Sequence, residues 1–196
     1  MLPEPSALDD LSSLIDTEKY LRPTSDIAAL MVLEHQCRTH NLMTKAKMTY
    51  ERAVYFQESY TDDELGSEEG MAWKTADSSG RSIAAALLFK GEAKPGEDGV
   101  EGAEEFLEVF EKRAVRSHSG EHLRELRLDG RMFQYRCSYM IHSKAFRILP
   151  TAVMERVFHY LRKALEHVGE DGPGPKEKSV IRTILEETVP GFKKES

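Results

Sequence analysis

Apolar residues recur at a helical period along most of the chain. From Ile27 to about Tyr60 the sequence contains neither glycine nor proline, and the segment Thr24–Asp26 before it supplies capping oxygens. This pattern predicts one long helix over residues 26–60. A second clear apolar stripe predicts another helix, which begins near Pro150 and ends near Gly169.

Weaker patterns predict the remaining elements. We expect short helices over 81–90, capped by Ser78 and Ser79, and over 104–115, 121–128 and 180–185. Asp129-Gly130 predicts a turn. The aromatic-rich stretch 132–146 suits both helix and strand, and we predict a helix there. Because alternating strand-like runs are otherwise nearly absent, the sequence predicts an all-α fold.

The distribution of proline and glycine predicts the domain organisation. Residues 1–24 contain three prolines and predict an extended N-terminal arm. Residues 25–196 predict a single helical domain, an irregular bundle around one long central helix, with loops at 91–102 and 169–176. The later helices are too short to bury their apolar stripes alone, which favours one domain over two.

Charge and composition exclude some classes of function. The chain has 27 Lys+Arg against 34 Asp+Glu, a formal net charge of -7, so no global positive field attracts nucleic acid. Its longest apolar runs, Ile27–Leu33 and Ile83–Phe89, fall far below the roughly 20 residues that cross a bilayer. We therefore predict no nucleic-acid partner and no transmembrane segment. The first residues lack the features of a secretory signal, which predicts a cytoplasmic protein if Met1 is the native start.

The two cysteines, Cys37 and Cys137, exclude two kinds of site. Neither lies in a Cys-x-x-Cys pattern, which excludes covalent haem attachment and a four-cysteine zinc site. Our preferred interpretation is two small buried thiols, and a disulfide between them is the alternative.

The seven histidines suggest metal binding, but their spacing argues against it. His35 and His40 would lie roughly 140° apart around a regular helix, too far to share an ion. His118 and His122 have a suitable spacing, but Gly120 between them disfavours a helix. His142, in the aromatic stretch, is either a core or rim histidine, an axial ligand of non-covalent haem, or a general base. No complete catalytic motif accompanies it, so the chain is not assigned as an enzyme.

A polar row is expected on the apolar face of the long helix. Projected at 100° per residue, Glu34, Arg38 and Asn41 fall within about 60° of one another, between apolar positions. We expect this row to be partly desolvated. It would then be a structural ion pair that fixes helix register or, alternatively, a ligand or proton-handling site.

Two stretches resemble a family of bacterial hypothetical proteins without an assigned activity. They are Ser25–Gln36, followed by His40-Asn41-Leu42-Met43-Thr44, and Tyr135–Phe146, followed by Leu149-Pro150. The match covers most of residues 20–190. The resemblance implies export to the periplasm or cell surface, and association with c-type cytochromes or other redox proteins.

Two hypotheses for function follow. The first is a helical cell-envelope protein associated with redox or ligand binding, which holds haem or another flat cofactor and contacts a redox or cell-envelope protein. That cofactor would lie among methionine and aromatic side chains, namely Met31, Met43, Met48, Tyr139, Met140 and His142. The alternative is a cofactor-free structural or protein-interaction module. The candidate ligand-binding residues are Glu34, His35, Arg38, Asn41, Cys137, Tyr139 and His142.

Overall fold

The predicted all-α fold is confirmed. The computed structural model describes residues 12, 16, 18, 26–61, 64–92, 95–96, 99–166 and 173–193. Six α-helices lie in these residues, together with one 3₁₀ helix and one two-stranded hairpin. The expected arm over 1–24 lies almost wholly outside them. Among the residues described, no helix combines the length and apolar character needed to span a bilayer.

The long helix α1 (Ile27–Tyr60) has nearly the predicted bounds. Asp26 is its N-cap, and the carboxylate accepts a hydrogen bond from the backbone N–H of Ala29 at 2.8 Å. The second carboxylate oxygen accepts the N–H of Ala103, at the start of α3 (Glu104–Lys112), at 2.7 Å. One side chain therefore fixes the starts of two helices that are far apart in the sequence.

At its other end, α1 is joined to α2 (Met71–Leu87) by a buried glutamine. The Gln57 side chain donates to the carbonyl of Glu64 at 3.0 Å and accepts the N–H of Ala72 at 2.7 Å. The first N–H groups of a helix have no partner within it. Gln57 thus supplies the cap that α2 lacks from its own N-cap residue, Gly70.

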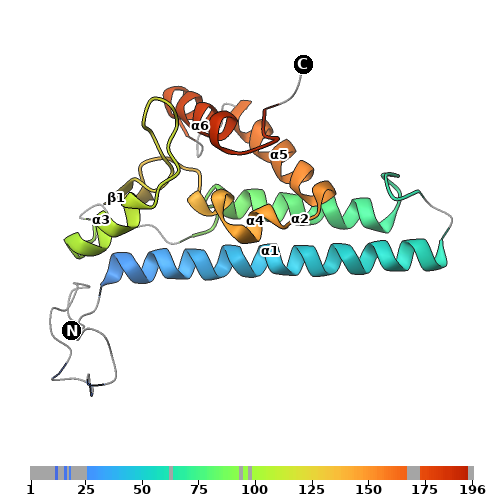
Figure 1. Cartoon of the computed structure of the whole chain (residues 1–196), viewed down its shortest axis with the longest axis horizontal. Helices are drawn as coiled ribbons and strands as arrows, with labels where there is room; N and C mark the ends of the chain where they lie inside the picture. The colour runs from blue at the N-terminus through green and yellow to red at the C-terminus, as the bar shows by residue number, and fades with distance from the viewer. Residues whose placement is uncertain are drawn as a thin grey trace.

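Helix α2 lies between α1 and α5 (Thr151–Glu166), while α1 forms one edge of the molecule (Figure 1). The sequence predicted that a helix begins at 81, capped by Ser78 and Ser79. That prediction was wrong, because both serines lie inside α2. Exposed serine side chains there satisfy their hydroxyls locally, as when Ser82 donates to the carbonyl of Ser78 at 3.0 Å, so they do not end the helix.

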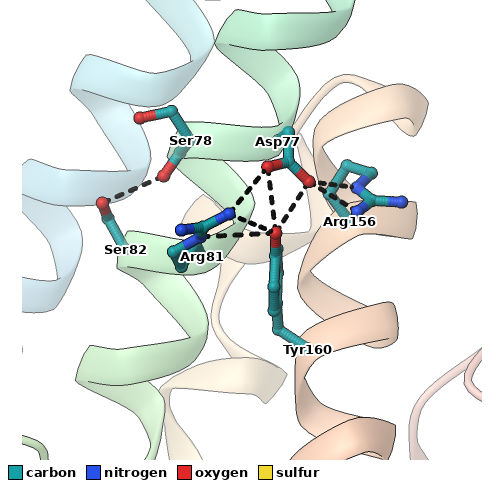
Figure 2. Close-up of polar contacts among 6 residues, drawn as sticks. All are labelled: Asp77, Ser78, Arg81, Ser82, Arg156 and Tyr160. Atoms are coloured by element: carbon teal, nitrogen blue, oxygen red, sulfur yellow. Dashed lines mark hydrogen bonds and ion pairs between the residues drawn. The ribbon is translucent and has the colours of Figure 1, made fainter. Parts of the chain in front are cut away.

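Figure 2 shows a polar cluster where α2 meets α5. Asp77 accepts hydrogen bonds from Arg156 Nε at 2.8 Å and from the Tyr160 hydroxyl at 2.9 Å. Arg81 donates to the same hydroxyl at 3.0 Å. Burial alone would raise the pKa of Asp77, but hydrogen bonds from Tyr160 and Arg156 outweigh it and hold that pKa below its usual value. The ionised carboxylate therefore links α5 to α2.

The segment after α3 departs most from the sequence-based expectations. The helix predicted over 121–128 was wrong: Arg116 and His122 form an isolated β-bridge, and β1 (Leu126–Asp129) pairs with β2 (Arg131–Phe133). Gly130 makes the predicted turn with a φ of 58°. Leu123, Leu126 and Leu128 gave this stretch a weak helical spacing, although the chain there forms a β-bridge followed by a hairpin.

The stretch 132–146 is also not one helix. It divides into the end of β2, the 3₁₀ helix η1 (Tyr139–His142) and the single-turn helix α4 (Lys144–Arg147). Ser138 and Ser143 cap these two turns by accepting N–H groups of Met140 and Phe146 at 3.1 Å each. The serines, which offered no helix signal in the aromatic pattern, decide where the chain turns. The last helix, α6 (Pro175–Thr188), begins at the end of the loop expected at 169–176 and is longer than predicted.

Close contact between α2 and α5 depends on Gly80. A Cβ atom at this position would lie 2.4 Å from the Cβ of Arg156 and 3.0 Å from the backbone nitrogen of Val157. The backbone of α5 cannot move away from Gly80 without breaking the hydrogen bonds of Arg156 and Tyr160 to Asp77, which lies one turn before Gly80 in α2.

We therefore expect Gly80→Ala to lower the free energy of unfolding by about 1–3 kcal/mol, although alanine is the better helix former. Urea denaturation measures the effect. Gly66→Ala is the control, since no atom lies within 4 Å of a Cβ there. If both variants unfolded at the same urea concentration as the parent, α2 and α5 would not be in backbone contact at Gly80.

Candidate functional site

A pocket with a volume of about 490 Å³ opens between α1, the connection from α3 to β1, and η1. Helix α1 contributes a wall of residues spaced three or four apart, so they share one face. The complete lining is Leu33, Gln36, Cys37, His40, Asn41, Arg113, Val115, Arg124, Tyr139, Met140, His142 and Ser143.

The pocket wall carries positive charge and no carboxylate. Arg113 and Arg124 both line it, and His40 and His142 add two imidazoles. This is notable because acidic residues outnumber basic ones in the chain by 34 to 27. The local charge is therefore opposite in sign to the net charge of the protein.

Arg124 is held by aromatic rings and not by an acid. Its guanidinium carbon lies 4.5 Å from the ring centroid of Phe110 and 4.4 Å from that of Tyr139. One nitrogen donates to the carbonyl of Phe110 at 3.3 Å. Burial lowers the pKa of Arg124, and nearby Arg113 lowers it further, while Tyr139 opposes the shift. No carboxylate of the described chain forms an ion pair with Arg124.

His142 lines the pocket as a neutral imidazole. Its Nε2 lies 2.8 Å from the Thr188 hydroxyl, which donates its own proton to the carbonyl of Ile184. Nε2 must therefore carry the proton of the neutral ring. Burial lowers the pKa of His142 to about 4, and the positive charges of Arg124 and Arg147 act in the same direction.

Behind the pocket, His35 lies fully buried between two polar partners. Its Nδ1 is 2.8 Å from the carboxylate of Glu92, and its Nε2 is 2.6 Å from the Ser138 hydroxyl oxygen. Every donor has an acceptor when Nδ1–H donates to Glu92 and the Ser138 O–H donates to Nε2. We call Glu92, His35 and Ser138 the buried relay.

The order carboxylate, histidine, serine is that of a nucleophilic triad. In such a triad, however, the serine hydroxyl must be accessible to the substrate, and here it is buried. Ser138 has no exposed surface and does not line the pocket. Its hydroxyl already accepts the N–H of Met140, and its own N–H donates to the carbonyl of Leu87 at 2.8 Å. The relay therefore positions the chain around the pocket and presents no nucleophile to it.

The structure gathers only part of the sequence-predicted site. Asn41, Tyr139 and His142 line the pocket, whereas His35 and Cys137 are buried and do not line it. Cys137 makes no disulfide, and burial raises its pKa to about 12. Cys37 is also a free thiol, but it is exposed on the pocket wall, so the expectation of two buried thiols holds only for Cys137.

The expected burial of the polar row on α1 was wrong. Glu34 and Asn41 are exposed. Arg38, with its side chain 38% exposed, forms an ion pair at 3.6 Å with Glu92 of the buried relay. Leu30, one of the apolar residues between which the row was predicted to lie, is 57% exposed. Apart from Val32 and Met43, the buried face of α1 is instead made of alanines and polar residues. Its members are Ala28, Val32, His35, Thr39, Met43, Ala46, Ala53 and Gln57. Because large apolar residues lie on several sides of α1, the helical projection assigned the wrong face of this helix to the core.

The proposed methionine and aromatic cofactor set does not form one site. Tyr139, Met140 and His142 line the pocket, whereas Met43 is buried without lining it and Met48 is exposed. Met31 and Met48 are 17 positions apart, about 25 Å along a helix. His142 Nε2 is occupied by Thr188. These residues do not fit haem as that hypothesis arranged it, and we derive no haem chemistry from them.

Sequence reasoning missed Glu92, Arg113 and Arg124. Glu92 lies in a stretch that composition marked only as an exposed loop. Arg124 lay in a predicted amphipathic helix, where an arginine is an ordinary surface residue. Only the hairpin fold and the aromatic rings of Phe110 and Tyr139 reveal its role, and neither was evident from the pattern.

Comparison of the chain with protein-family models, with curated proteins and with solved structures gave no match.

His118 and His122, whose spacing in the sequence suits a shared metal ion, have different surroundings and different hydrogen-bond partners. His118 is exposed and pairs with Glu187 at 3.0 Å, while His122 is buried and accepts the N–H of Arg124. Within the described ranges, no three histidine, cysteine or acidic side chains group as metal ligands.

The buried relay predicts that substitutions at the adjacent positions 35 and 34 change the free energy of unfolding by unequal amounts. His35→Leu would leave the Glu92 carboxylate, 4% exposed, buried without its imidazole partner. We expect a loss of about 3 kcal/mol in the free energy of unfolding, measured by urea denaturation. Glu34→Ala, on the exposed side of the same helix, serves as the control and should stay within about 0.5 kcal/mol of the parent. Equal losses would contradict the assignment of the two faces.

His142 predicts a specific loss of stability in acid. The pKa of His142 is about 4 in the folded protein, and its usual value is 6.5, so the unfolded chain binds more protons between these two pH values. Stability is fully present above pH 6.5 and falls as the pH drops towards 4. We expect the parent to lose on the order of 2 kcal/mol more than His142→Gln between pH 7 and pH 4. Urea midpoints at pH 7, 5.5 and 4 test this; parallel profiles would mean that His142 is solvated.

Proposed function

We propose that this protein binds a small organic anion in the pocket between α1, the α3–β1 connection and η1. The observation that carries the proposal is Arg124, a half-buried cation in a pocket wall without a carboxylate partner among the described residues. Burying a charge is costly unless a partner of opposite sign compensates it. An anionic ligand would provide that compensation.

The way Arg124 is held supports this proposal. Phe110 and Tyr139 both contact the guanidinium, with their ring centroids 5.0 Å apart, and the Phe110 carbonyl accepts one of its N–H groups. A guanidinium has five N–H donors, so several remain for a ligand. Rings fix its plane without neutralising its charge, which suits bidentate recognition of a carboxylate or phosphate.

The apolar part of the wall favours an organic anion over a simple inorganic one. Leu33, Val115 and Met140 line the same pocket as the two arginines. A volume of about 490 Å³ lies within the roughly 300–1,000 Å³ of small-molecule sites. A ligand with a carboxylate and a compact apolar body, such as an arylacetate, has both kinds of complementary surface.

This proposal keeps the ligand-binding part of the hypothesis from the sequence. The cell-envelope location and the redox partner belong to it only through the resemblance to the bacterial family. A second candidate, a protein-interaction module, is favoured by apolar side chains on the open edge of α1, where Leu33 is 53% exposed and Met48 is 65% exposed.

Titration with phenylacetate tests the proposed function. We expect Arg124→Gln to weaken phenylacetate binding about tenfold or more, because a buried charge-assisted hydrogen bond contributes roughly 1.5–3 kcal/mol. Isothermal calorimetry or chemical-shift titration gives the dissociation constants. Arg127→Gln is the matched control, since Arg127 is exposed, pairs with Asp129 and does not line this pocket.

Unchanged affinity in Arg124→Gln would overturn the proposal, as would equal weakening in the two variants, which would indicate diffuse electrostatic attraction. A variant that binds less well must also remain folded. Its helical circular dichroism and its urea midpoint therefore accompany the titration.

A further inference from the structure

The exposed aromatic side chains of the described residues all lie at one end of α1. Tyr55, Phe56 and Tyr60 are 62%, 37% and 73% exposed, and every other described phenylalanine, tyrosine or tryptophan is buried or partly buried. Their ring centroids are 5.9 Å apart between Tyr55 and Phe56 and 5.8 Å apart between Phe56 and Tyr60. We call these three side chains the aromatic end of α1.

The aromatic end lies away from the other elements of the bundle. Figure 1 shows this end of α1, with the start of α2, at the opposite end of the molecule from α3 and the hairpin. Exposed apolar surface that is gathered in one place marks a contact with a partner, and tyrosine and phenylalanine are enriched in such contacts. The aromatic end is therefore a candidate docking surface.

The chain beside the aromatic end is strongly acidic. Residues 58–70 contain six acidic residues and no lysine, arginine or histidine, which is a charge of -6 against the net charge of -7 of the whole chain. Glu58, Glu64 and Glu68 are exposed and form no ion pair with another described residue. Their negative charge is therefore available to a partner of opposite sign.

Arg52 shows which kind of group these rings accept. Its guanidinium carbon lies 5.4 Å from the centroid of the Phe56 ring, although both side chains are exposed. The rings of Tyr55 and Tyr60 carry no such cation from the described part of the chain. A guanidinium of another protein would make the same contact with them.

We propose that the aromatic end of α1 docks an arginine-rich segment of a partner protein. The guanidinium groups of that segment contact the rings of Tyr55 and Tyr60, and the carboxylates of Glu58, Glu64 and Glu68 attract its positive charge. The inference is independent of the anion pocket, because none of these residues lines that pocket.

The charge of this region disfavours the other occupants of an exposed aromatic surface. A second copy of the chain, packed through the same surface, would bring a second segment with a charge of -6. Nucleic acid and anionic lipid are repelled for the same reason. A cationic protein segment is the occupant for which aromatic contact and charge act in the same direction.

Calorimetric titration with a synthetic peptide of alternating arginine and alanine tests the inference, at about 0.15 M salt to screen distant charges. We expect Tyr55→Ser/Tyr60→Ser to bind the peptide about tenfold more weakly than the parent, because two cation–π contacts are lost. Val109→Ser/Ile148→Ser is the matched control. It changes two apolar residues that are 47% and 53% exposed on other parts of the surface, and it should bind like the parent.

A second pair of variants tests the acidic residues. Glu64→Gln/Glu68→Gln should weaken peptide binding several-fold, because both carboxylates lie beside the aromatic end. Glu104→Gln/Glu108→Gln removes the same charge from exposed positions of α3 and should leave binding within twofold of the parent. Equal weakening by the two pairs would indicate diffuse attraction to an acidic protein and would overturn the inference.

Other results also contradict the proposal. It is wrong if the parent does not bind the peptide, or if Tyr55→Ser/Tyr60→Ser binds it as tightly as the parent. It is equally wrong if sedimentation shows a parent dimer that this variant makes monomeric, since a second copy then covers the surface. Binding of phosphatidylglycerol vesicles to the parent and not to this variant would assign the surface to a membrane.

The stability of the variant is measured alongside. Because both tyrosines are exposed, Tyr55→Ser/Tyr60→Ser should keep the urea midpoint and the helical circular dichroism of the parent. If the midpoint falls, Tyr60→Lys replaces it, since lysine is a good helix former and brings a charge that repels the peptide. The same weakening of peptide binding is expected, and unchanged affinity in a folded Tyr60→Lys would overturn the inference.

Discussion

The buried relay of Glu92, His35 and Ser138 is the interaction on which the pocket depends. It joins three segments that are distant in sequence. His35 belongs to α1, Glu92 to the connection after α2, and Ser138 directly precedes η1. A buried imidazole between a carboxylate and a hydroxyl accepts little displacement, since each lost contact leaves a polar group without water or partner. The relay therefore fixes the position of η1 relative to α1, and residues of both elements line the pocket.

Aromatic packing surrounds the relay and completes its isolation from solvent. Phe89 lies 4.6 Å from the His35 ring and 5.2 Å from the Phe133 ring, measured between centroids. Phe89 holds a left-handed φ of 55°, a conformation that costs a bulky residue roughly 1–3 kcal/mol. Its contacts with these rings offset that cost, and the left-handed turn directs the chain after α2 so that Glu92 reaches His35.

The sequence was informative where local chemistry decides structure. The uninterrupted run from Ile27 and the capping carboxylate of Asp26 predicted α1, and Asp129-Gly130 predicted the turn. Prediction failed where distant segments decide. A helical period does not show which face of α1 is covered when apolar residues lie on several sides, and Ala46 and Ala53 are buried because α2 approaches closely. The relay could not be predicted, because Glu92 and Ser138 are separated from His35 by 57 and 103 positions.

The same reasoning explains how an acidic protein keeps a cationic pocket. A carboxylate near Arg124 would neutralise the charge, and Glu121 and Glu125 are its close neighbours in sequence. Glu121 instead accepts hydrogen bonds from Ser117 and Ser119, which lower its pKa together with a backbone hydrogen bond. The rings of Phe110 and Tyr139, with centroids 5.0 Å apart and nearly perpendicular planes, both lie within 4.5 Å of the guanidinium carbon and to the same side of it, and no acid can approach the guanidinium from that side. The positive charge of Arg124 thus stays without an acidic partner among the described residues, although the chain as a whole is acidic.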